Sequence, residues 1–325
     1  MPSLGDWSVP LAVQPRPGDY AYDLETALSS VVSVSAHVPP DAFTAETLGT
    51  ERAGNGVLIR EDGLVLTIGY LVTEAETIWL TSPDGQAAPG HVLGYDQVTG
   101  FGLVQALAPL DLPFLALGAS RDAAVGERVV VAGAGGRTRS VAAYVVARQE
   151  FAGYWEYLLE DAIFTAPAHP HWGGAALIGP AGDLLGIGSL HVQQQIGPGR
   201  TAHLNMVVPT DLLSPILEDL ISIGRPRRPP RPWLGLFASE AEDQVVVVGL
   251  AGKGPAARAG LRAGDVIVAV AGHEVSTLAE FYRAVWALGE AGCDVPLTLR
   301  READVFDVRV TSGDRNRFLK APRLH

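Results

Sequence analysis

Short apolar runs separated by Gly, Pro and Asp follow one another from about residue 31 to residue 210. Most are four or five residues long and rich in Val, Leu and Ile, as β-strands are. Many short strands at regular spacing with turn signals between them predict an all-β barrel or sandwich. The clearest runs are residues 56–59, 64–67, 77–80, 91–94, 128–132 and 142–146.

Two segments of this region have a helical pattern instead. Residues 23–30 predict a short helix that leads into an alternating strand at 31–35. Residues 211–223 carry apolar side chains at helical spacing, which predicts one amphipathic helix with Asp211 as its cap. The apolar positions are Leu212, Leu213, Ile216, Leu217, Leu220 and Ile221.

A proline- and arginine-rich stretch, residues 224–232, predicts a linker because it cannot pair in a sheet. The pattern after it is typical of a small α+β domain, with strands at 234–237, 245–248, 265–270, 295–299 and 306–310 and helices near 256–259 and 278–288. The predicted organisation is an N-terminal segment (1–30), a β domain (31–223), the linker (224–232), the α+β domain (233–314) and a basic tail (315–325).

Charge and cysteine content exclude several classes of protein. The net charge of −12 argues against nucleic-acid and anionic-membrane binding. Cys293 is the single cysteine, so no intrachain disulfide forms. Residues 1–22 have no signal-peptide pattern, and no apolar run approaches the roughly 20 residues of a membrane helix. The sequence therefore predicts a cytoplasmic protein without a cofactor.

Residues 254–275 resemble the core of a bacterial PDZ domain, with turn glycines at Gly260 and Gly264. PDZ domains add an extended C-terminal peptide to a sheet edge and hold its carboxylate on backbone N–H groups. The resemblance predicts peptide-binding residues in the first strand and its preceding loop, and on the second helix. They are Trp233, Leu234, Gly235, Leu236, Phe237, Phe281 and Val285. The two helix residues could equally fill the core.

Residues 54–210 resemble the protease domain of the HtrA/Deg family, a chymotrypsin-like double β-barrel. The glycine-rich hairpin that begins at Gly54 and the segment ending at Pro209 carry this resemblance. It implies a mainly β fold with a catalytic His, Asp and Ser. The corresponding positions hold Tyr70, Gly100 and Trp172.

These substitutions predict a loss of protease chemistry. A Ser-His-Asp triad needs a hydroxyl nucleophile, a base that titrates near neutral pH and a carboxylate that orients the base. Trp172 has no nucleophile, the phenol of Tyr70 is a poor base, and Gly100 has no side chain. Pro170, at an oxyanion-hole position, lacks an N–H. We therefore expect a pseudoprotease that is not an enzyme.

Two histidines are the remaining candidates for chemistry. His169 and His171 flank Pro170 and could face one side of an extended strand, where a transition metal could bind. Loop histidines without a ligand are the commoner case, and the sequence predicts no metal site.

The leading functional hypothesis is a scaffold or adaptor that binds protein C-termini through the PDZ domain. One alternative is a chaperone-like regulator that forms mixed assemblies with an active protease. Another is a metal-binding or enzymatic role at a new site near His169 and His171. The resemblance also implies a homo-oligomer, a trimer in this family, for which Trp7, Tyr20 and Tyr22 are candidate contacts.

Overall fold

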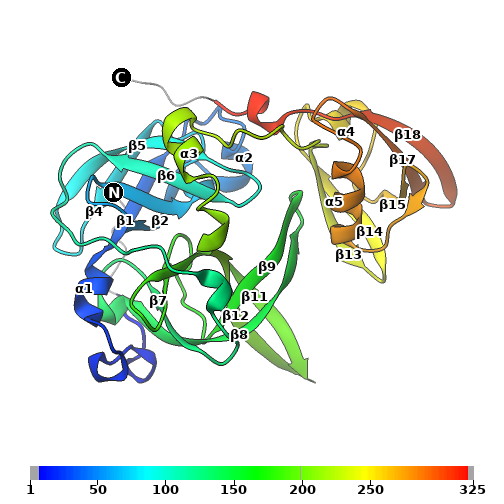
Figure 1. Ribbon diagram of the computed structural model, residues 1–325. Helices are drawn as coiled ribbons and strands as arrows, with labels where there is room; N and C mark the ends of the chain where they lie inside the picture. Colours follow the sequence, from blue (N-terminus) through cyan, green and yellow to red (C-terminus); the bar gives the residue numbers. More distant parts are fainter. Residues whose placement is uncertain (1–6, 198, 321–325) are drawn as a thin grey trace. The chain divides into compact units, whose positions relative to one another are not determined.

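A computed structural model describes residues 7–197 and 199–320. Residues 1–6 of the predicted N-terminal segment and 321–325 of the predicted basic tail, Arg323 included, lie outside the described residues. The described chain forms two compact units (Figure 1). The first holds residues up to Gln149 and Asp161–Arg227, and the second holds Glu150–Glu160 and Arg228–Lys320. The predicted domain limits stay a prediction.

Six strands of the first unit close into a barrel in the order β1-β2-β3-β6-β5-β4. Their alternating apolar side chains point inward, and Val34, Leu66 and Leu103 are fully buried. The strands are β1 (Val31–His37), β2 (Glu51–Leu58), β3 (Leu64–Ile68), β4 (Thr77–Thr81), β5 (Ala87–Tyr95) and β6 (Phe101–Ala106).

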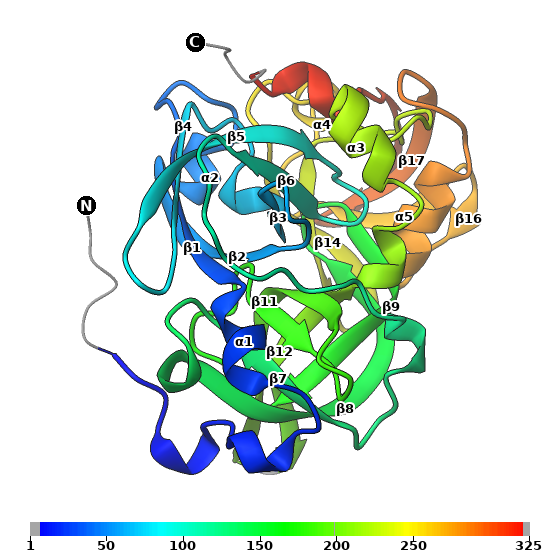
Figure 2. The ribbon, with the colours of Figure 1, turned by 60° about the vertical axis from the view of Figure 1, so that its left-hand side comes forward.

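The next six strands close into a second barrel in the order β10-β11-β12-β9-β8-β7 (Figure 2). Its core contains Val129, Val131, Ile163, Leu177 and Val207, all fully buried. The strands are β7 (Arg128–Ala132), β8 (Ser140–Gly153), β9 (Tyr157–Ala166), β10 (Ala176–Ile178), β11 (Leu184–Gly197) and β12 (Arg200–Pro209). The predicted double-barrel, mainly β fold is confirmed.

Helices of the first unit are short. In α1 (Leu24–Ser29), the N-cap Asp23 accepts a hydrogen bond from the backbone N–H of Thr26. The helix predicted over 211–223 is shorter than expected: a 3-10 turn at Thr210–Leu212 precedes α3 (Leu217–Ile223). Pro215 lies between them, and a proline disfavours helical geometry in the residue before it. The other short helices are α2 (Ala45–Leu48) and 3-10 turns at Leu11–Val13, Pro17–Asp19, Gly69–Leu71, Ser120–Asp122 and Arg137–Arg139.

The second unit is one sheet in the order β13-β14-β15-β17-β18, with β16 paired to β15. Strand β13 is therefore an edge strand of this sheet. The strands are β13 (Leu236–Ala241), β14 (Gln244–Leu250), β15 (Val266–Val270), β16 (His273–Glu274), β17 (Asp294–Arg301) and β18 (Asp304–Thr311). The helices are α4 (Pro255–Arg258), α5 (Leu278–Trp286) and a final 3-10 turn at Arg315–Phe318.

Helix α5 begins at a capping box. The side chain of Thr277 accepts from the N–H of Glu280, whose carboxylate accepts from the N–H of Thr277. Its apolar face, with Leu278, Phe281 and Val285, joins the core of the second unit.

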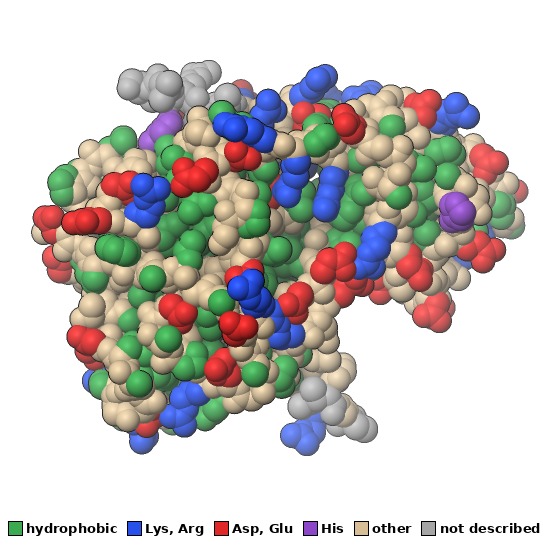
Figure 3. Space-filling model, viewed as in Figure 1, with side chains coloured by type: hydrophobic (Ala, Val, Ile, Leu, Met, Phe, Trp, Pro, Cys, Tyr) green, Lys and Arg blue, Asp and Glu red, His purple; other side chains and the backbone are tan. Residues whose placement is uncertain are grey.

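Within the described residues, every helix is too short or too polar to cross a lipid bilayer. Acidic and basic side chains are interspersed on the face seen in Figure 3. The excess of acidic residues, which gives the net charge of −12, therefore does not gather into one acidic patch on that face.

Candidate functional site

The structure brings Tyr70, Gly100 and Trp172, the residues expected at the triad positions, to one place between the two barrels. Tyr70 follows β3 and Gly100 precedes β6, two strands that pair with Ile68 opposite Phe101. The N–H of Gly69 donates to the carbonyl of Gly100 over 2.6 Å, which fixes the two segments side by side.

Tyr70 links the two barrels. Its hydroxyl donates to the carbonyl of Ser189 on β11 over 3.0 Å. Burial raises the pKa of Tyr70, and a hydrogen bond with the side chain of Trp172 acts in the opposite direction. Since the raised pKa keeps the phenol protonated near neutral pH, Tyr70 is a hydrogen-bond donor here and not a base.

The loop that carries Trp172 is held from the first barrel by Asn55. The side-chain amide of Asn55 donates to the carbonyls of His171 (2.9 Å) and Gly173 (3.1 Å). Gly174 has φ +76°, and a Cβ on it would lie 1.8 Å from the carbonyl oxygen of Asn55. Only glycine fits there, so the loop keeps a fixed shape that presents an indole where the nucleophile is expected.

The two histidines of the metal alternative do not present free ring nitrogens together. The N–H of His171 donates to Nδ1 of His169 over 3.0 Å, so the other nitrogen, Nε2, carries the hydrogen and donates to the carbonyl of Arg139 over 2.7 Å. Burial lowers the pKa of His169 to about 4, which keeps the ring neutral. His171 instead packs against Trp7, with ring centroids 4.2 Å apart and the ring planes tilted by 40°. No cluster of three potential metal ligands occurs among residues 7–197 and 199–320.

A row of rings continues outward from Trp172. Its indole lies 5.3 Å from the ring of His191, which in turn lies 5.1 Å from His203. Nδ1 of His203 and Nε2 of His191 are 3.2 Å apart and form a hydrogen bond, in which one ring donates and the other accepts. A nucleophilic hydroxyl or thiol is not part of this row.

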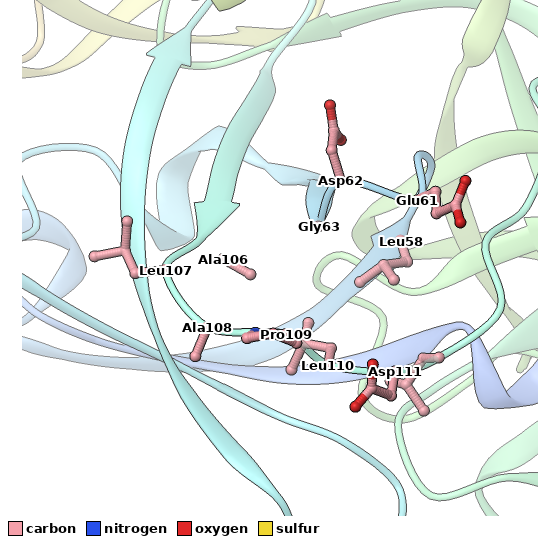
Figure 4. A pocket seen from close by; sticks show the side chains of 11 residues that line it. Leu58, Glu61, Asp62, Gly63, Ala106, Leu107, Ala108, Pro109, Leu110 and Asp111 are labelled. Atoms are coloured by element: carbon pink, nitrogen blue, oxygen red, sulfur yellow. The ribbon is translucent and has the colours of Figure 1, made fainter.

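A surface cavity of about 500 Å³ lies elsewhere on the first unit (Figure 4). Glu61, Asp62 and Asp111 line it together with Leu58 and Leu110. None of the triad-position residues belongs to its wall, so it is separate from the site between the barrels.

A second candidate site lies in the second unit, at the residues we name the amide loop: Leu234, Gly235 and Leu236. Their three backbone N–H groups donate to one carboxylate, that of Glu156, over 2.9, 2.7 and 3.2 Å respectively. Gly235 has φ +73°, a conformation that favours glycine. Three N–H groups that converge on one carboxylate form a backbone anion site.

Glu156 lies at the tip of the β8–β9 hairpin, whose residues 150–160 belong to the second unit. The N–H of Ala238 on β13 donates to the carbonyl of Tyr154 over 2.9 Å, so the tip hydrogen-bonds the edge strand. The hydroxyl of Tyr282 on α5 donates to the carbonyl of Gly153 over 2.7 Å and accepts from the N–H of Glu156 over 3.3 Å. The tip therefore contacts both β13 and α5.

The other predicted peptide-binding residues lie in different surroundings. The backbone of Trp233 pairs with Gly313, and its ring lies 4.8 Å from Phe318. Phe237 is half-buried, 5.9 Å from the ring of Tyr154. Phe281 and Val285 are buried in the apolar core, which also contains Leu158 of the hairpin. The sequence left open whether these two helix residues face the groove or fill the core.

Sequence reasoning missed Glu156 and Tyr282. Glu156 is 78 residues from Leu234 along the chain, so no local pattern connects them. The available signal was compositional. Four aromatic residues crowd positions 151–157, which is unusual for a plain hairpin turn.

Two closed barrels followed by a sheet with an anion-binding loop define a trypsin-like peptidase domain joined to a PDZ domain. The profile "Trypsin-like peptidase domain" matches residues 54–187, and "PDZ domain" matches residues 232–311. The chain thus combines a trypsin-like peptidase domain with a PDZ domain.

Curated relatives match about four-fifths of this chain. A probable periplasmic serine endoprotease DegP-like of Halomonas elongata is 27% identical over 80% of this chain and 56% of its own length. The corresponding protein of Chlamydia trachomatis is 28% identical over 79% and 53%. Serine endoprotease DegS of Haemophilus influenzae is 24% identical over 82% and 78%. The chain spans about half the length of the first two relatives.

A solved structure, the HtrA-type protease AlgW with decapeptide, has the same fold. The match has a TM-score of 0.53 at 21% identity and covers 92% of this chain and 98% of that one.

These comparisons correct two predictions. The prediction that the chain is not an enzyme is wrong, because its relatives are named serine endoproteases. It rested on four positions, Tyr70, Gly100, Pro170 and Trp172, whereas the relatives match about four-fifths of the chain. The prediction of a cytoplasmic protein is wrong as well, since the relatives are named periplasmic. It rested on the lack of a signal-peptide pattern in residues 1–22 and of an apolar run as long as a membrane helix.

Proposed function

We propose that this chain captures extended peptides by their C-terminal carboxylate on the amide loop and serves as a scaffold or adaptor that holds them. The ligand's backbone would pair with β13, and its last side chain would lie toward α5.

The observation that carries the proposal is that the amide loop binds a carboxylate through its backbone N–H groups. Leu234, Gly235 and Leu236 donate three hydrogen bonds to the two oxygens of Glu156. A peptide's terminal carboxylate has the same two oxygens and the same charge. Strand β13 also lies at the edge of its sheet, where an added strand can pair.

A scaffold role for the barrels is supported by the site between them. Tyr70 bonds across the two barrels, and Asn55 fixes the loop that carries Trp172. The side chains at the triad positions therefore serve the packing between the barrels. The proposal concerns the second unit, and its test does not depend on hydrolysis by the first.

Binding of a labelled pool of decapeptides with apolar C-terminal residues, measured by fluorescence polarisation, tests this function. The pool should bind with a free carboxylate and lose at least tenfold in affinity when amidated, because charged hydrogen bonds contribute roughly 1.5–3 kcal/mol. Gly235→Ala should weaken binding similarly, since alanine is strained at φ +73°.

Gly252→Ala is the matched control, because a Cβ there meets nothing within 4 Å. Equal binding of the amidated and free pools would contradict the proposed function.

We also propose a homo-oligomer, a trimer, formed through the amino-terminal aromatic residues. Trp7 Nε1, Tyr20 Oη and Tyr22 Oη are buried without a hydrogen-bond partner among the described residues. The rings of Trp7, Tyr20 and Tyr22 are only half-buried in the single chain, so part of each ring is available to a neighbouring subunit. Light scattering that gives the monomer mass of 34.2 kDa would contradict it.

A further inference from the structure

We propose that the β8–β9 hairpin tip is an internal ligand of the amide loop, which closes the peptide site until an incoming C-terminus displaces Glu156. This inference rests on the proposed function and adds its regulation. The two ligands would compete for the same three N–H groups, so binding of one excludes the other.

The tip occupies the site as an added peptide would. Its carboxylate sits on the amide loop, and the carbonyl of Tyr154 accepts from Ala238 at the free edge of β13. Leu158, 7% exposed, packs into the core beside α5. Carboxylate, edge-strand hydrogen bond and apolar side chain are the three contacts that a PDZ ligand makes.

The tip also has features of a segment that can be released. Glu156 has φ +59°, the left-handed region that non-glycine residues rarely adopt. Its carboxylate is fully buried, whereas the ion pairs that clamp the hairpin are exposed. Arg283 on α5 pairs with Glu150 and Glu160 on the two sides of the tip. Exposed pairs of this kind contribute little, so a competing ligand has few strong contacts to break there.

The electrostatics of Glu156 also favours release of the hairpin tip from the amide loop. Burial raises the pKa of Glu156 to about 7, although the three N–H groups and nearby Arg315 act to lower it. Tyr282 also faces Glu156, and burial and the charge of Glu156 raise the pKa of Tyr282, so the phenol stays neutral. Because burial disfavours the ionised form, ionisation of Glu156 weakens its hold on the closed site and makes its displacement easier.

Hydrogen exchange of the full chain, followed by mass spectrometry and by NMR at Gly235, Leu236 and Ala238, tests closure directly. The three amides should be protected in the wild type. They should exchange at least tenfold faster in Glu156→Gln, which keeps the shape of the side chain but replaces one accepting oxygen by an NH2 group that cannot accept from the amide loop. In Arg283→Ala, which removes only the exposed ion pairs, they should exchange at most slightly faster.

Glu160→Gln is the control, because that carboxylate lies on the same hairpin and does not contact the amide loop. It should exchange like the wild type, or at most slightly faster. Wild-type amides that exchange as fast as those of Glu156→Gln would overturn closure.

Peptide binding then separates this inference from the proposed function. If the closed form holds about nine-tenths of the molecules, Glu156→Gln should bind the free-carboxylate decapeptide pool about tenfold more tightly than the wild type. Equal, tight binding by both proteins would overturn closure and leave the proposed function standing. Absence of binding by both, with fast amide exchange in the variant, would overturn the proposed function and with it the regulatory role of the hairpin.

Discussion

At the scale of single residues, the site between the barrels is built for packing. Tyr70 donates to the carbonyl of Ser189 with a phenol that burial keeps protonated. Trp172 stacks on His191, and Gly100 contributes a backbone carbonyl to Gly69. Tyr70, Gly100 and Trp172 supply neither a nucleophile nor a base near neutral pH, although the relatives are named serine endoproteases.

We therefore predict that Trp172→Ala does not lower any casein hydrolysis that the purified protein shows. An indole has no atom to attack a peptide bond, whereas loss of a true nucleophile lowers kcat by about a thousandfold or more. The measurement is release of labelled peptides from casein by both proteins, with thermal unfolding as the control for folding. A thousandfold fall in a folded variant would show that Trp172 belongs to a catalytic site.

At the scale of elements, the second unit is tied together by an ion pair between the buried Asp265 and the partly exposed Arg301. Asp265 precedes β15, is 1% exposed and accepts from Nε and Nη2 of Arg301 at the end of β17 over 2.7 and 2.8 Å. The N–H of Arg262 donates to the same carboxylate over 2.8 Å. Arg301 holds the pKa of Asp265 below its usual range.

Asp265→Asn should therefore destabilise the second unit by more than the loss of an exposed ion pair, because it breaks a two-pronged, charge-assisted contact with Arg301 at a carboxylate that is 1% exposed. In the wild type the contribution of this pair should be complete above the ordinary aspartate pKa of roughly 4 and be lost as pH falls through the depressed value. Urea unfolding between pH 3 and 7 measures both effects. Asp294→Asn, in an exposed pair with Arg309, is the control and should cost about 1 kcal/mol or less. A loss no larger than that of the control would contradict the assigned role.

Most elements could be predicted because their determinants are local. The short apolar runs predicted the strands of both barrels, and Gly260 and Gly264 predicted the turns after α4. The length of helix α3 was overestimated because the apolar residues of 211–223 keep helical spacing on both sides of Pro215, although the proline separates a 3-10 turn from the helix. The amide loop could be located from Gly235, but its partner Glu156 could not. That contact depends on how a hairpin of the second barrel folds onto β13 and α5, which no spacing in the chain records.

At the scale of the whole molecule, the second unit is completed by a segment that begins and ends in the second barrel. Strands β8 and β9 belong to that barrel, yet residues 150–160 between them pack with the PDZ sheet. Opening of the peptide site therefore requires movement of a piece of the trypsin-like domain.

The titration of the Glu156 side-chain carboxyl, followed by its 13C chemical shift, tests this account most directly. In the free protein we predict a midpoint near the raised pKa of about 7, because the carboxyl is buried on the amide loop. The raised value means that the closed form holds its proton more tightly than the open form. Closure should therefore weaken as pH rises toward 7, and peptide affinity should increase roughly tenfold between pH 6 and 8.

A saturating decapeptide with a free C-terminal carboxylate should move the Glu156 midpoint to the ordinary glutamate value of roughly 4.3, since the displaced side chain returns to water. The amidated peptide should leave the midpoint near 7. A peptide that binds tightly at the amide loop while the Glu156 midpoint stays unchanged would contradict the account.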